Sequence, residues 1–259
     1  MEYGFCDLSV VAVRREPSNL SEMTTQLLFG DIFQIIKKQD EWIQVKIFYD
    51  EYEGWINQTQ FKQISGETFI KLTNTSPDLS TDLVQLIIND TQKTVIPILM
   101  GSSFPCLVNN SFHIEETKYI FEGQTADKNK FKNRNNIAET AYMYLNAPYL
   151  WGGRSPFGID CSGFTQMVFK LNGIKLPRDA NQQASIGDIL SFPDEPQQGD
   201  LAFFENDEKK ITHVGIILGK SQIIHASGKV RINKIDNRGI FNIDLNKYTH
   251  SLKFIRKII

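Results

Sequence analysis

One stretch, residues 147–164 (APYLWGGRSPFGIDCSGF), constrains the fold more than any other part of the chain. Its aromatic, glycine-rich first half leads into a predicted helix whose first turn carries Cys161, flanked by Asp160 and Ser162. The apolar side of that helix begins only afterwards, at Phe164. Backbone N–H groups in a first helical turn lack partners and carry partial positive charge, which lowers a thiol pKa. The sequence therefore predicts a nucleophilic thiolate at the start of a helix.

A cysteine without such surroundings is most often a small buried side chain. We expect this plainer role, packing in a core, for Cys6 and Cys106. Three widely spaced cysteines predict no disulfide framework, so a reducing compartment is expected. The chain has no CxxC or HExxH pattern, and its histidines lack the spacing of metal ligands. We therefore expect neither a metal site nor a cofactor.

Length and charge limit the classes of function. The 259 residues allow two or three domains, each with its own core. The formal net charge of −2 gives no support to nucleic-acid binding, which favours a basic surface. No run approaches the roughly 18 apolar residues that span a bilayer, so no membrane partner is expected. The first residues show no leader pattern, and we expect a cytoplasmic protein.

The first half of the chain has the pattern of short strands. Residues 1–65 show alternating apolar side chains broken by turn residues, which predicts a small antiparallel barrel. Residues 66–128 repeat the pattern less regularly and predict a second, diverged barrel. The polar stretch 124–136 is the predicted linker. The predicted strands are Leu8–Val13, Asp31–Lys37, Trp42–Phe48, Gly54–Ile56, Thr68–Leu72, Leu83–Ile88, Thr94–Leu99, Ser111–Ile114 and Tyr119–Phe121.

The pattern changes to helices after the linker. Apolar residues recur every four positions from 137 to 145 and predict an amphipathic helix. A second helix is predicted from Cys161 to an Asn-Gly stop at 172–173, and a short helical segment is expected to end at Ala184. Helices followed by an antiparallel sheet predict an α+β domain. The predicted strands of that sheet are Leu201–Glu205, His213–Leu218, Ile223–Ala226, Val230–Ile232 and Leu252–Ile258.

A cysteine nucleophile needs a base and a group that orients the base. His213 begins the predicted strand THVGIIL, and His225 lies in the next one, IIHASG. If these strands form a hairpin around residues 219–221, opposed positions have numbers that sum to about 440, so His225 lies opposite Gly215. Gly215 is two residues from His213 on the same strand, so His213 and His225 lie on the same face of the hairpin. The spacing permits a Cys-His-His relay.

Each histidine also has a plainer interpretation. Taken alone, His213 is a partly exposed polar residue at a strand end, and His225 is a core histidine bonded to a backbone carbonyl. We expect no catalytic role for the other two. His113 lies in the irregular second barrel, and His250 precedes the last predicted strand in a polar turn.

Five blocks, YLWGGRSPFGIDCSGF, LPRDA, QQGDLAFF, HVGIIL and IIHASG, follow one another in the order found in a known family. Residues 130–259 resemble the NlpC family of bacterial cell-wall cysteine peptidases, whose fold is a compact papain-like α+β domain. The resemblance implies that Cys161 is the nucleophile, His213 the base and His225 the third residue, which orients the base. It also implies that Tyr149 and the backbone N–H of Cys161 hold the oxyanion.

The start of the chain resembles a bacterial SH3-like domain. The matching features are RREP at residues 14–17, Gly-Asp at 30–31, an Asp-x-Trp strand start at 40–42 and Gly-Trp-Ile at 54–56. The expected fold class is therefore α+β, with two small SH3-like β-barrels, residues 1–65 and 66–128, ahead of an NlpC-type peptidase domain, residues 129–259.

This arrangement resembles the γ-D-glutamyl-L-diamino-acid peptidases, which release dipeptides from murein peptides. The resemblance implies hydrolysis of the bond between γ-D-Glu and the diamino acid, in murein recycling, with recognition of a free N-terminal L-Ala. We expect a monomer. Carboxylates suit that amine because a charge taken from water needs a partner. The implied substrate-binding residues are Glu22, Tyr52 and Asp179 for the amine, and Trp151, Asp160, Ser162 and Arg178 for the rest of the dipeptide.

Some of these residues have alternatives. Glu22 is otherwise a solvated loop acid, and Tyr52 otherwise packs on Trp55. Ala180 follows Asp179 where the resembling subgroup tends to carry serine, which removes one possible hydrogen bond. Three other functions stay open: an endopeptidase that acts on intact cell wall, a transferase that uses the same acyl-enzyme, and a wall-fragment binding protein without catalysis.

Overall fold

The computed structural model describes residues 1–191 and 195–259. The chain divides into two units, Met1–Ala126 and Asp127–Ile259. Within the described residues, no helix is long and apolar enough to cross a membrane.

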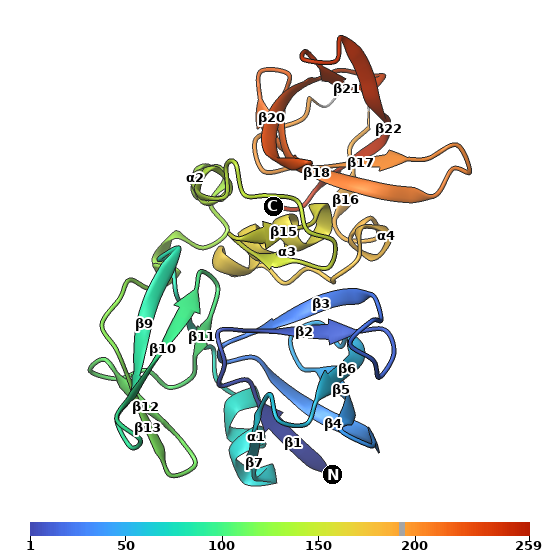
Figure 1. Ribbon diagram of the computed structural model, residues 1–259. Helices are drawn as coiled ribbons and strands as arrows, with labels where there is room; N and C mark the ends of the chain where they lie inside the picture. The colour runs from blue at the N-terminus through green and yellow to red at the C-terminus, as the bar shows by residue number, and fades with distance from the viewer. Residues whose placement is uncertain (192–194) are drawn as a thin grey trace. The chain divides into compact units, whose positions relative to one another are not determined.

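The first unit opens with a seven-stranded antiparallel sheet in the order β3-β2-β6-β5-β4-β1-β7 (Figure 1). Alternate side chains point into its core, as Ile43, Val45 and Ile47 do on β5. The predicted strands correspond to β2, β4, β5 and β6, while β1, β3 and β7 were not predicted. The strands are β1 (Glu2–Phe5), β2 (Val10–Arg14), β3 (Met23–Leu28), β4 (Ile32–Gln39), β5 (Trp42–Ile47), β6 (Glu53–Asn57) and β7 (Lys62–Ile64).

One predicted strand of the first unit, Thr68–Leu72, is wrong. It lies in helix α1 (Gly66–Thr73), whose N-cap Ser65 accepts the Thr68 N–H at 3.1 Å. The helix buries Leu72, and Phe69 stacks on Tyr3 with ring centroids 4.1 Å apart. A short apolar run has no clear period, so the capping serine decides between helix and strand.

The remaining strands of this unit do not confirm a second SH3-like barrel. They form a four-stranded antiparallel sheet in the order β10-β9-β13-β12 and a separate pair, β8 with β11. Their core is shared with the first sheet, since Phe5 and Phe29 pack in one cluster with Phe104 and Tyr119. The strands are β8 (Asp78–Leu79), β9 (Val84–Asn89), β10 (Thr94–Leu99), β11 (Ser103–Phe104), β12 (Ser111–Ile114) and β13 (Thr117–Phe121).

In the second unit, the predicted antiparallel sheet closes into a barrel. The six strands from β17 to β22 form a ring because β22 pairs with both β17 and β21, as Figure 1 shows at the top of the view. Register shifts along β22 help it to bend between its two partners. The strands are β16 (Asp188–Ile189), β17 (Leu201–Glu205), β18 (Ile211–Gly219), β19 (Gln222–Ser227), β20 (Lys229–Ile235), β21 (Gly239–Asn242) and β22 (Lys247–Lys257).

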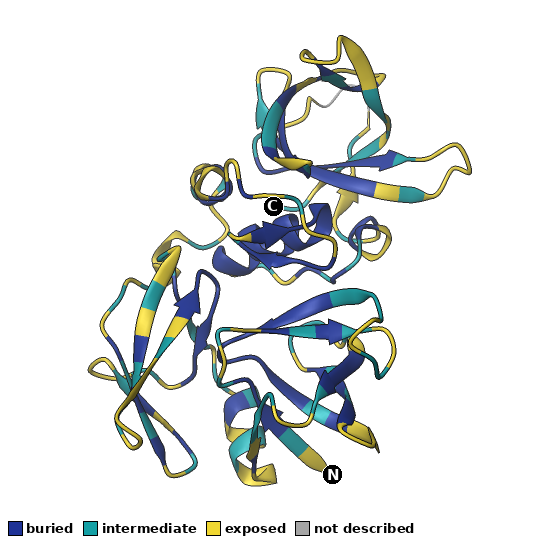
Figure 2. Ribbon diagram, in the orientation of Figure 1, coloured by how far each residue is buried: buried dark blue, intermediate teal, exposed yellow. Residues whose placement is uncertain are grey.

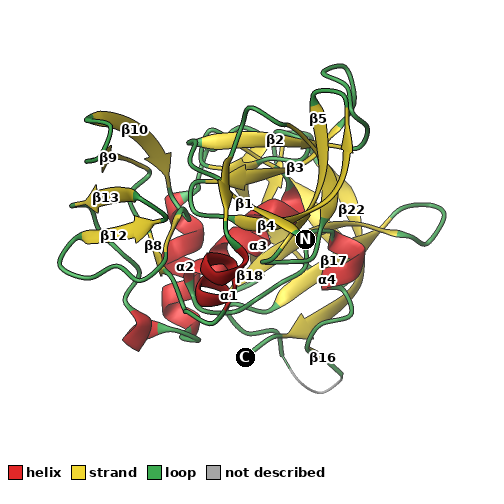
Figure 3. Cartoon of the chain, turned by 90° about the horizontal axis from the view of Figure 1, so that it is seen from below, coloured by secondary structure: helices red, strands yellow, loops and turns green. Residues whose placement is uncertain are grey.

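Helix α3 (Cys161–Leu171) is the buried element of this unit. All of its residues are buried, and it appears uniformly dark in Figure 2. It packs on β18 and β19, while α2 and α4 also contact β18 (Figure 3). The helix α2 begins inside the predicted linker, capped by the Asn133 side chain. The other elements are a single 3₁₀ turn at Lys128–Lys130, α2 (Arg134–Met143), β14 (Arg154–Ser155), β15 (Gly158–Ile159) and α4 (Ala180–Gln183).

Candidate active site

The loop that leads to Cys161 is held on both sides by backbone hydrogen bonds. On one side, the Tyr149 N–H donates to the Gly228 carbonyl at 3.0 Å. On the other side, the Leu150 N–H donates to the Ile159 carbonyl at 3.2 Å. Because the loop pairs with two separate segments, it loses much of its conformational freedom. Tyr149 is therefore fixed beside the segment that enters α3.

Asp160 caps the first turn of α3. Its Oδ1 accepts the Gly163 N–H at 2.7 Å, and its Oδ2 accepts the Gly152 N–H at 2.8 Å. One carboxylate thus joins the helix start to the glycine-rich loop. A Cβ on Gly163 would lie 2.3 Å from the Gly153 carbonyl oxygen, so only glycine allows the loop and helix to approach this closely.

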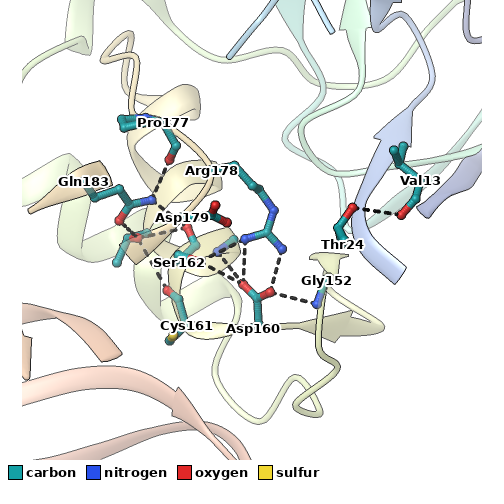
Figure 4. Close-up of polar contacts among 12 residues, drawn as sticks. Val13, Thr24, Gly152, Asp160, Cys161, Ser162, Pro177, Arg178, Asp179 and Gln183 are labelled. Atoms are coloured by element: carbon teal, nitrogen blue, oxygen red, sulfur yellow. Dashed lines mark hydrogen bonds and ion pairs between the residues drawn. The ribbon is translucent and has the colours of Figure 1, made fainter. Parts of the chain in front are cut away.

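The same carboxylate pairs with the guanidinium of Arg178, as Figure 4 shows. Nη1 lies 3.0 Å from Oδ1 and Nη2 lies 2.6 Å from Oδ2, and both side chains are buried. Nη1 also donates to the Ser162 hydroxyl at 2.9 Å. A buried ion pair needs such a full set of hydrogen bonds to offset its desolvation. Asp160, Ser162 and Arg178 thus form a buried network next to the nucleophile, and their contacts with substrate stay a prediction.

Cys161 is the first residue of α3, and 6% of its surface is exposed. Burial, followed by the charge of Asp160, raises the pKa of its thiol to about 12, although the nearby Val214 N–H acts in the opposite direction. Desolvation thus acts against the resting thiolate that the sequence predicts, in opposition to the helix end. The same Val214 N–H shows that the sulfur lies beside β18, one residue from His213.

Strands β18 and β19 pair in the predicted register. Ile216 lies opposite Ile224, a sum of 440. His213 and His225 therefore share a face, and His213 Nε2 lies 2.9 Å from His225 Nδ1. A Cβ on Gly215 would lie 2.9 Å from the Cβ of His225, so a glycine at this position leaves room for the second imidazole.

Asn233 extends the relay beyond the predicted residues. Its Oδ1 lies 3.1 Å from His225 Nε2, and its Nδ2 donates to the Phe241 carbonyl at 3.4 Å. The side chain is buried on β20. Sequence reasoning missed it, although the alternation of KVRINKI places it on the same face as the core residue Ile235.

These bonds assign the protons of both imidazoles. His225 Nε2 donates to Asn233 Oδ1, so the neutral ring keeps Nδ1 as an acceptor. His213 Nε2 donates to that Nδ1, which leaves its own Nδ1 without a proton. Burial lowers the pKa of both rings, that of His225 to about 4. The site thus holds a neutral base whose Nδ1 is able to accept a proton, and the next residue along β18, Val214, has its N–H against the Cys161 sulfur.

His250 is part of the site, contrary to the expectation from sequence. It lies within β22, which starts at Lys247, rather than in a turn before it. Its ring stacks on His213 with centroids 4.1 Å apart and planes 28° apart, and it lies 5.6 Å from the His225 ring. The first residues of β22 are polar and lack the apolar alternation by which a strand is recognised.

The Tyr149 hydroxyl remains a donor at physiological pH. Burial raises its pKa to about 12, and the charge of Asp160 and that of an ionised Cys161 act in the same direction. The hydroxyl therefore keeps its proton within electrostatic reach of the nucleophile. Its role in holding an oxyanion stays a prediction.

The other predicted binding residues are divided between the two units. In the second unit, Trp151 is 58% exposed, and Asp179 is half-buried at the start of α4. In the first unit, Glu22 pairs with Arg15 at 2.8 Å, and Tyr52 packs against the core of the first sheet. The joint action of these residues in one site stays a prediction.

The described part of the chain, residues 1–191 and 195–259, contains no group of three or more His, Cys, Asp or Glu side chains placed to hold a metal ion. All three cysteines are free thiols. Cys6 is buried in the first sheet, whereas Cys106 is exposed, so the packing role predicted for the latter is wrong.

Comparison with known families gives two matches. Residues 146–246 match the NlpC/P60 family, and residues 13–61 match the bacterial dipeptidyl-peptidase SH3 domain. A Bacillus subtilis protein named gamma-D-glutamyl-L-lysine dipeptidyl-peptidase is 30% identical over 215 residues, which cover 78% of this chain and 71% of the relative. The chain belongs to the NlpC/P60 family. It is therefore a cysteine peptidase, and an SH3-like domain precedes its NlpC/P60 domain.

Two further comparisons extend over most of the chain. Dipeptidyl-peptidase 6 of Lysinibacillus sphaericus is 29% identical over 261 residues, which cover 86% of this chain and 88% of the relative. The crystal structure of an NlpC/P60 family protein from Bacillus cereus has a TM-score of 0.83 and 22% identity, and the match covers 99% of each chain. This structural likeness supports the NlpC/P60 fold.

Proposed function

We propose that the protein hydrolyses the amide bond between γ-D-Glu and the following diamino acid in murein peptides with a free N-terminal L-Ala. The products are L-Ala-γ-D-Glu and a peptide that begins with the diamino acid. The observation that carries this proposal is the extent of the likeness to dipeptidyl-peptidases, which covers 78–86% of the chain and so includes both the SH3-like part and the peptidase part. The names of two of these relatives favour lysine as the diamino acid.

The arrangement of side chains supports the acylation step. The thiol proton moves from Cys161 to Nδ1 of His213, and the sulfur attacks the γ-carbonyl carbon of D-Glu. The negative charge that develops on the carbonyl oxygen is stabilised by the Tyr149 hydroxyl and the Cys161 N–H. The His213 imidazolium then protonates the leaving amine, the C–N bond breaks, and a thioester on Cys161 remains.

Water completes the cycle by hydrolysing the thioester. His213 takes a proton from the attacking water, and the C–S bond breaks as the thiol is restored with that proton. The bond from His213 to His225, and from His225 to Asn233, keeps the base in the tautomer that both steps need. A neutral resting pair also avoids the cost of two buried charges before substrate binds.

Two alternatives are weaker. A probable endopeptidase p60 of Listeria seeligeri is 42% identical over 104 residues, yet this match covers 40% of the chain and 19% of the relative. The likeness therefore supports the peptidase chemistry but does not extend to the SH3-like part of the chain. A binding protein without catalysis has no need of the bonded chain from His213 to Asn233.

The deciding experiment compares four peptides with the purified protein: L-Ala-γ-D-Glu-L-Lys-D-Ala, its diaminopimelate equivalent, and the N-acetylated form of each. Mass spectrometry identifies the bond that breaks. We expect cleavage after γ-D-Glu in both free peptides, faster with lysine, and little in the acetylated ones. Equal cleavage of free and acetylated peptides would instead support the endopeptidase, and no cleavage of any peptide by a folded protein would support the binding protein.

We also propose that the protein acts in the cytoplasm on peptides already released from the wall. Support comes from its free cysteines, which suit a reducing compartment. Fractionation of cells that carry a tagged full-length protein tests the location.

A further inference from the structure

The base imidazole of the site is enclosed on more sides than the relay requires. His225 meets it edge-on, with ring centroids 5.1 Å apart and planes 87° apart. Phe204 on β17 lies 5.7 Å away at a tilt of 48°. His250 on β22 covers one of its flat faces, at 4.1 Å and 28°. His213 is thus contacted by rings from three other strands of the barrel, β17, β19 and β22.

The hydrogen bond to His225 does not by itself fix the orientation of the His213 ring, and ring stacking can. The bond to His225 fixes one nitrogen of His213, but an imidazole can still tilt about that bond. A tilt would displace Nδ1, the nitrogen proposed to take the thiol proton, and misplacement of a reacting group by about 1 Å can cost a factor of roughly 100 in rate. A ring packed flat on the imidazole opposes that tilt.

We propose that His250 is a positioning residue that holds the His213 imidazole in its reactive orientation through the flat face of its own ring. The inference rests on the proposed role of His213 as the base. It assigns no proton transfer to His250, whose Nδ1 lies 2.9 Å from the Thr249 hydroxyl rather than from another ring.

The charges around His250 determine how its removal affects pH dependence. The titratable groups next to it are His213 on β18 and His225 on β19, and Arg231 on β20 acts on His225. On β17, Glu205 lies opposite Ser251 and is neutralised by Lys209 and Lys253. On β21, the apolar Ile240 lies opposite His250.

A positive charge on His250 opposes a positive charge on His213. The pKa of His213 is lowered first by burial and then by the charges of His225 and His250. Loss of the His250 charge therefore raises the pKa of the base, and the acid side of the pH profile moves to higher pH.

Two variants of full-length protein separate the ring from the space that it fills. His250→Phe keeps a flat ring without charge, whereas His250→Leu fills the space without a ring. His113→Leu, at the histidine of the first unit, is the matched control. His213→Ala tests the base itself. Each variant is assayed for kcat and KM on the free lysine peptide across pH.

A second readout needs no peptide substrate. The rate at which iodoacetamide alkylates Cys161 reports on the thiol and its base directly, and peptide mass spectrometry separates it from the exposed Cys106. If the peptide is not cleaved, the proposed substrate is wrong, yet alkylation still tests His250. If His213→Ala leaves both readouts unchanged, the base is wrong and this inference falls with it.

We expect His250→Leu to lower kcat and the alkylation rate by roughly 10- to 100-fold with little change in KM. His250→Phe should stay close to the parent at neutral pH, with its acid limb shifted to higher pH. Equal losses in both variants, or a His250→Leu variant that behaves like His113→Leu, would overturn the proposal. If His250→Leu does not fold, His250→Gln, which also lacks a ring, takes its place, and activity and alkylation rates equal to those of the parent overturn the proposal.

Discussion

The Nε2 atom of His213 lies 2.9 Å from the Nδ1 atom of His225, and this contact sets the direction of the whole relay. Because His225 donates its only N–H to Asn233, it can only accept from His213. The nitrogen of His213 left without a proton is then the one that can take the thiol proton. A side chain on β20 thus controls the tautomer of the base.

Asn233 is therefore expected to matter without touching substrate. Asn233→Ala should lower kcat by roughly 10-fold, which corresponds to a net hydrogen-bond contribution of about 1.4 kcal/mol. KM for the free lysine peptide should change little. Asn89→Ala, at another buried strand asparagine, is the control for loss of stability. Equal activity in the two variants would show that the amide does not set the tautomer.

The resting thiol is expected to be neutral. Because burial raises the pKa of Cys161 to about 12, the ultraviolet absorbance of a thiolate should be absent at neutral pH in the difference between the parent and Cys161→Ser. It should appear only in strongly alkaline solution. A thiolate signal at neutral pH would mean that the helix end and His213 outweigh burial.

The buried histidines predict a loss of stability in acid. Burial lowers the pKa of His225 to about 4, below its ordinary value of 6.5, so the unfolded chain binds more protons in this range. The stability is complete above pH 6.5 and declines as the pH falls toward 4, by up to about 3 kcal/mol from this residue. Urea unfolding at several pH values measures the slope, and His225→Leu should reduce it. The same slope in parent and variant would contradict this assignment.

The pair of Asp160 and Arg178 should contribute more to stability than an exposed pair. Arg178→Met leaves a buried carboxylate without its cation and should cost about 3–5 kcal/mol in the free energy of unfolding. Arg15→Met, which breaks the exposed pair with Glu22, should cost no more than about 1 kcal/mol. Chemical denaturation compares the two. Similar costs would mean that the buried network does not hold the start of α3.

The sequence predicted the features that depend on local pattern. The helix that starts at Cys161 follows from its polar cap and apolar stripe, and the structure ends it at Leu171, just before the predicted Asn-Gly stop. The opposition of Ile216 and Ile224 follows from a short hairpin turn, which fixes register. The short run Thr68–Leu72 had no such period, and its helix depends on the capping Ser65.

Features that depend on packing were not visible in the sequence. The thiol pKa of Cys161 is set by burial that only the assembled unit creates. His250 lies in a strand whose first residues are polar, so its pattern resembles a turn, and Asn233 lies just beyond the predicted strand Val230–Ile232. Closure of the barrel by β22 brings the His250 ring onto the His213 ring. The sequence spacing of the two histidines does not predict this contact.

The most direct test of the account is to identify the residue that becomes acylated. A thioester is hydrolysed faster than an amide acylates a thiol, so the acyl-enzyme is built up with an activated ester of L-Ala-γ-D-Glu, whose good leaving group lets acylation outpace hydrolysis. After an acid quench, peptide mass spectrometry should place one L-Ala-γ-D-Glu acyl group on Cys161 in the parent and much less in His213→Ala. An acyl group on a residue other than Cys161, or undiminished labelling of Cys161 in His213→Ala, would contradict the account.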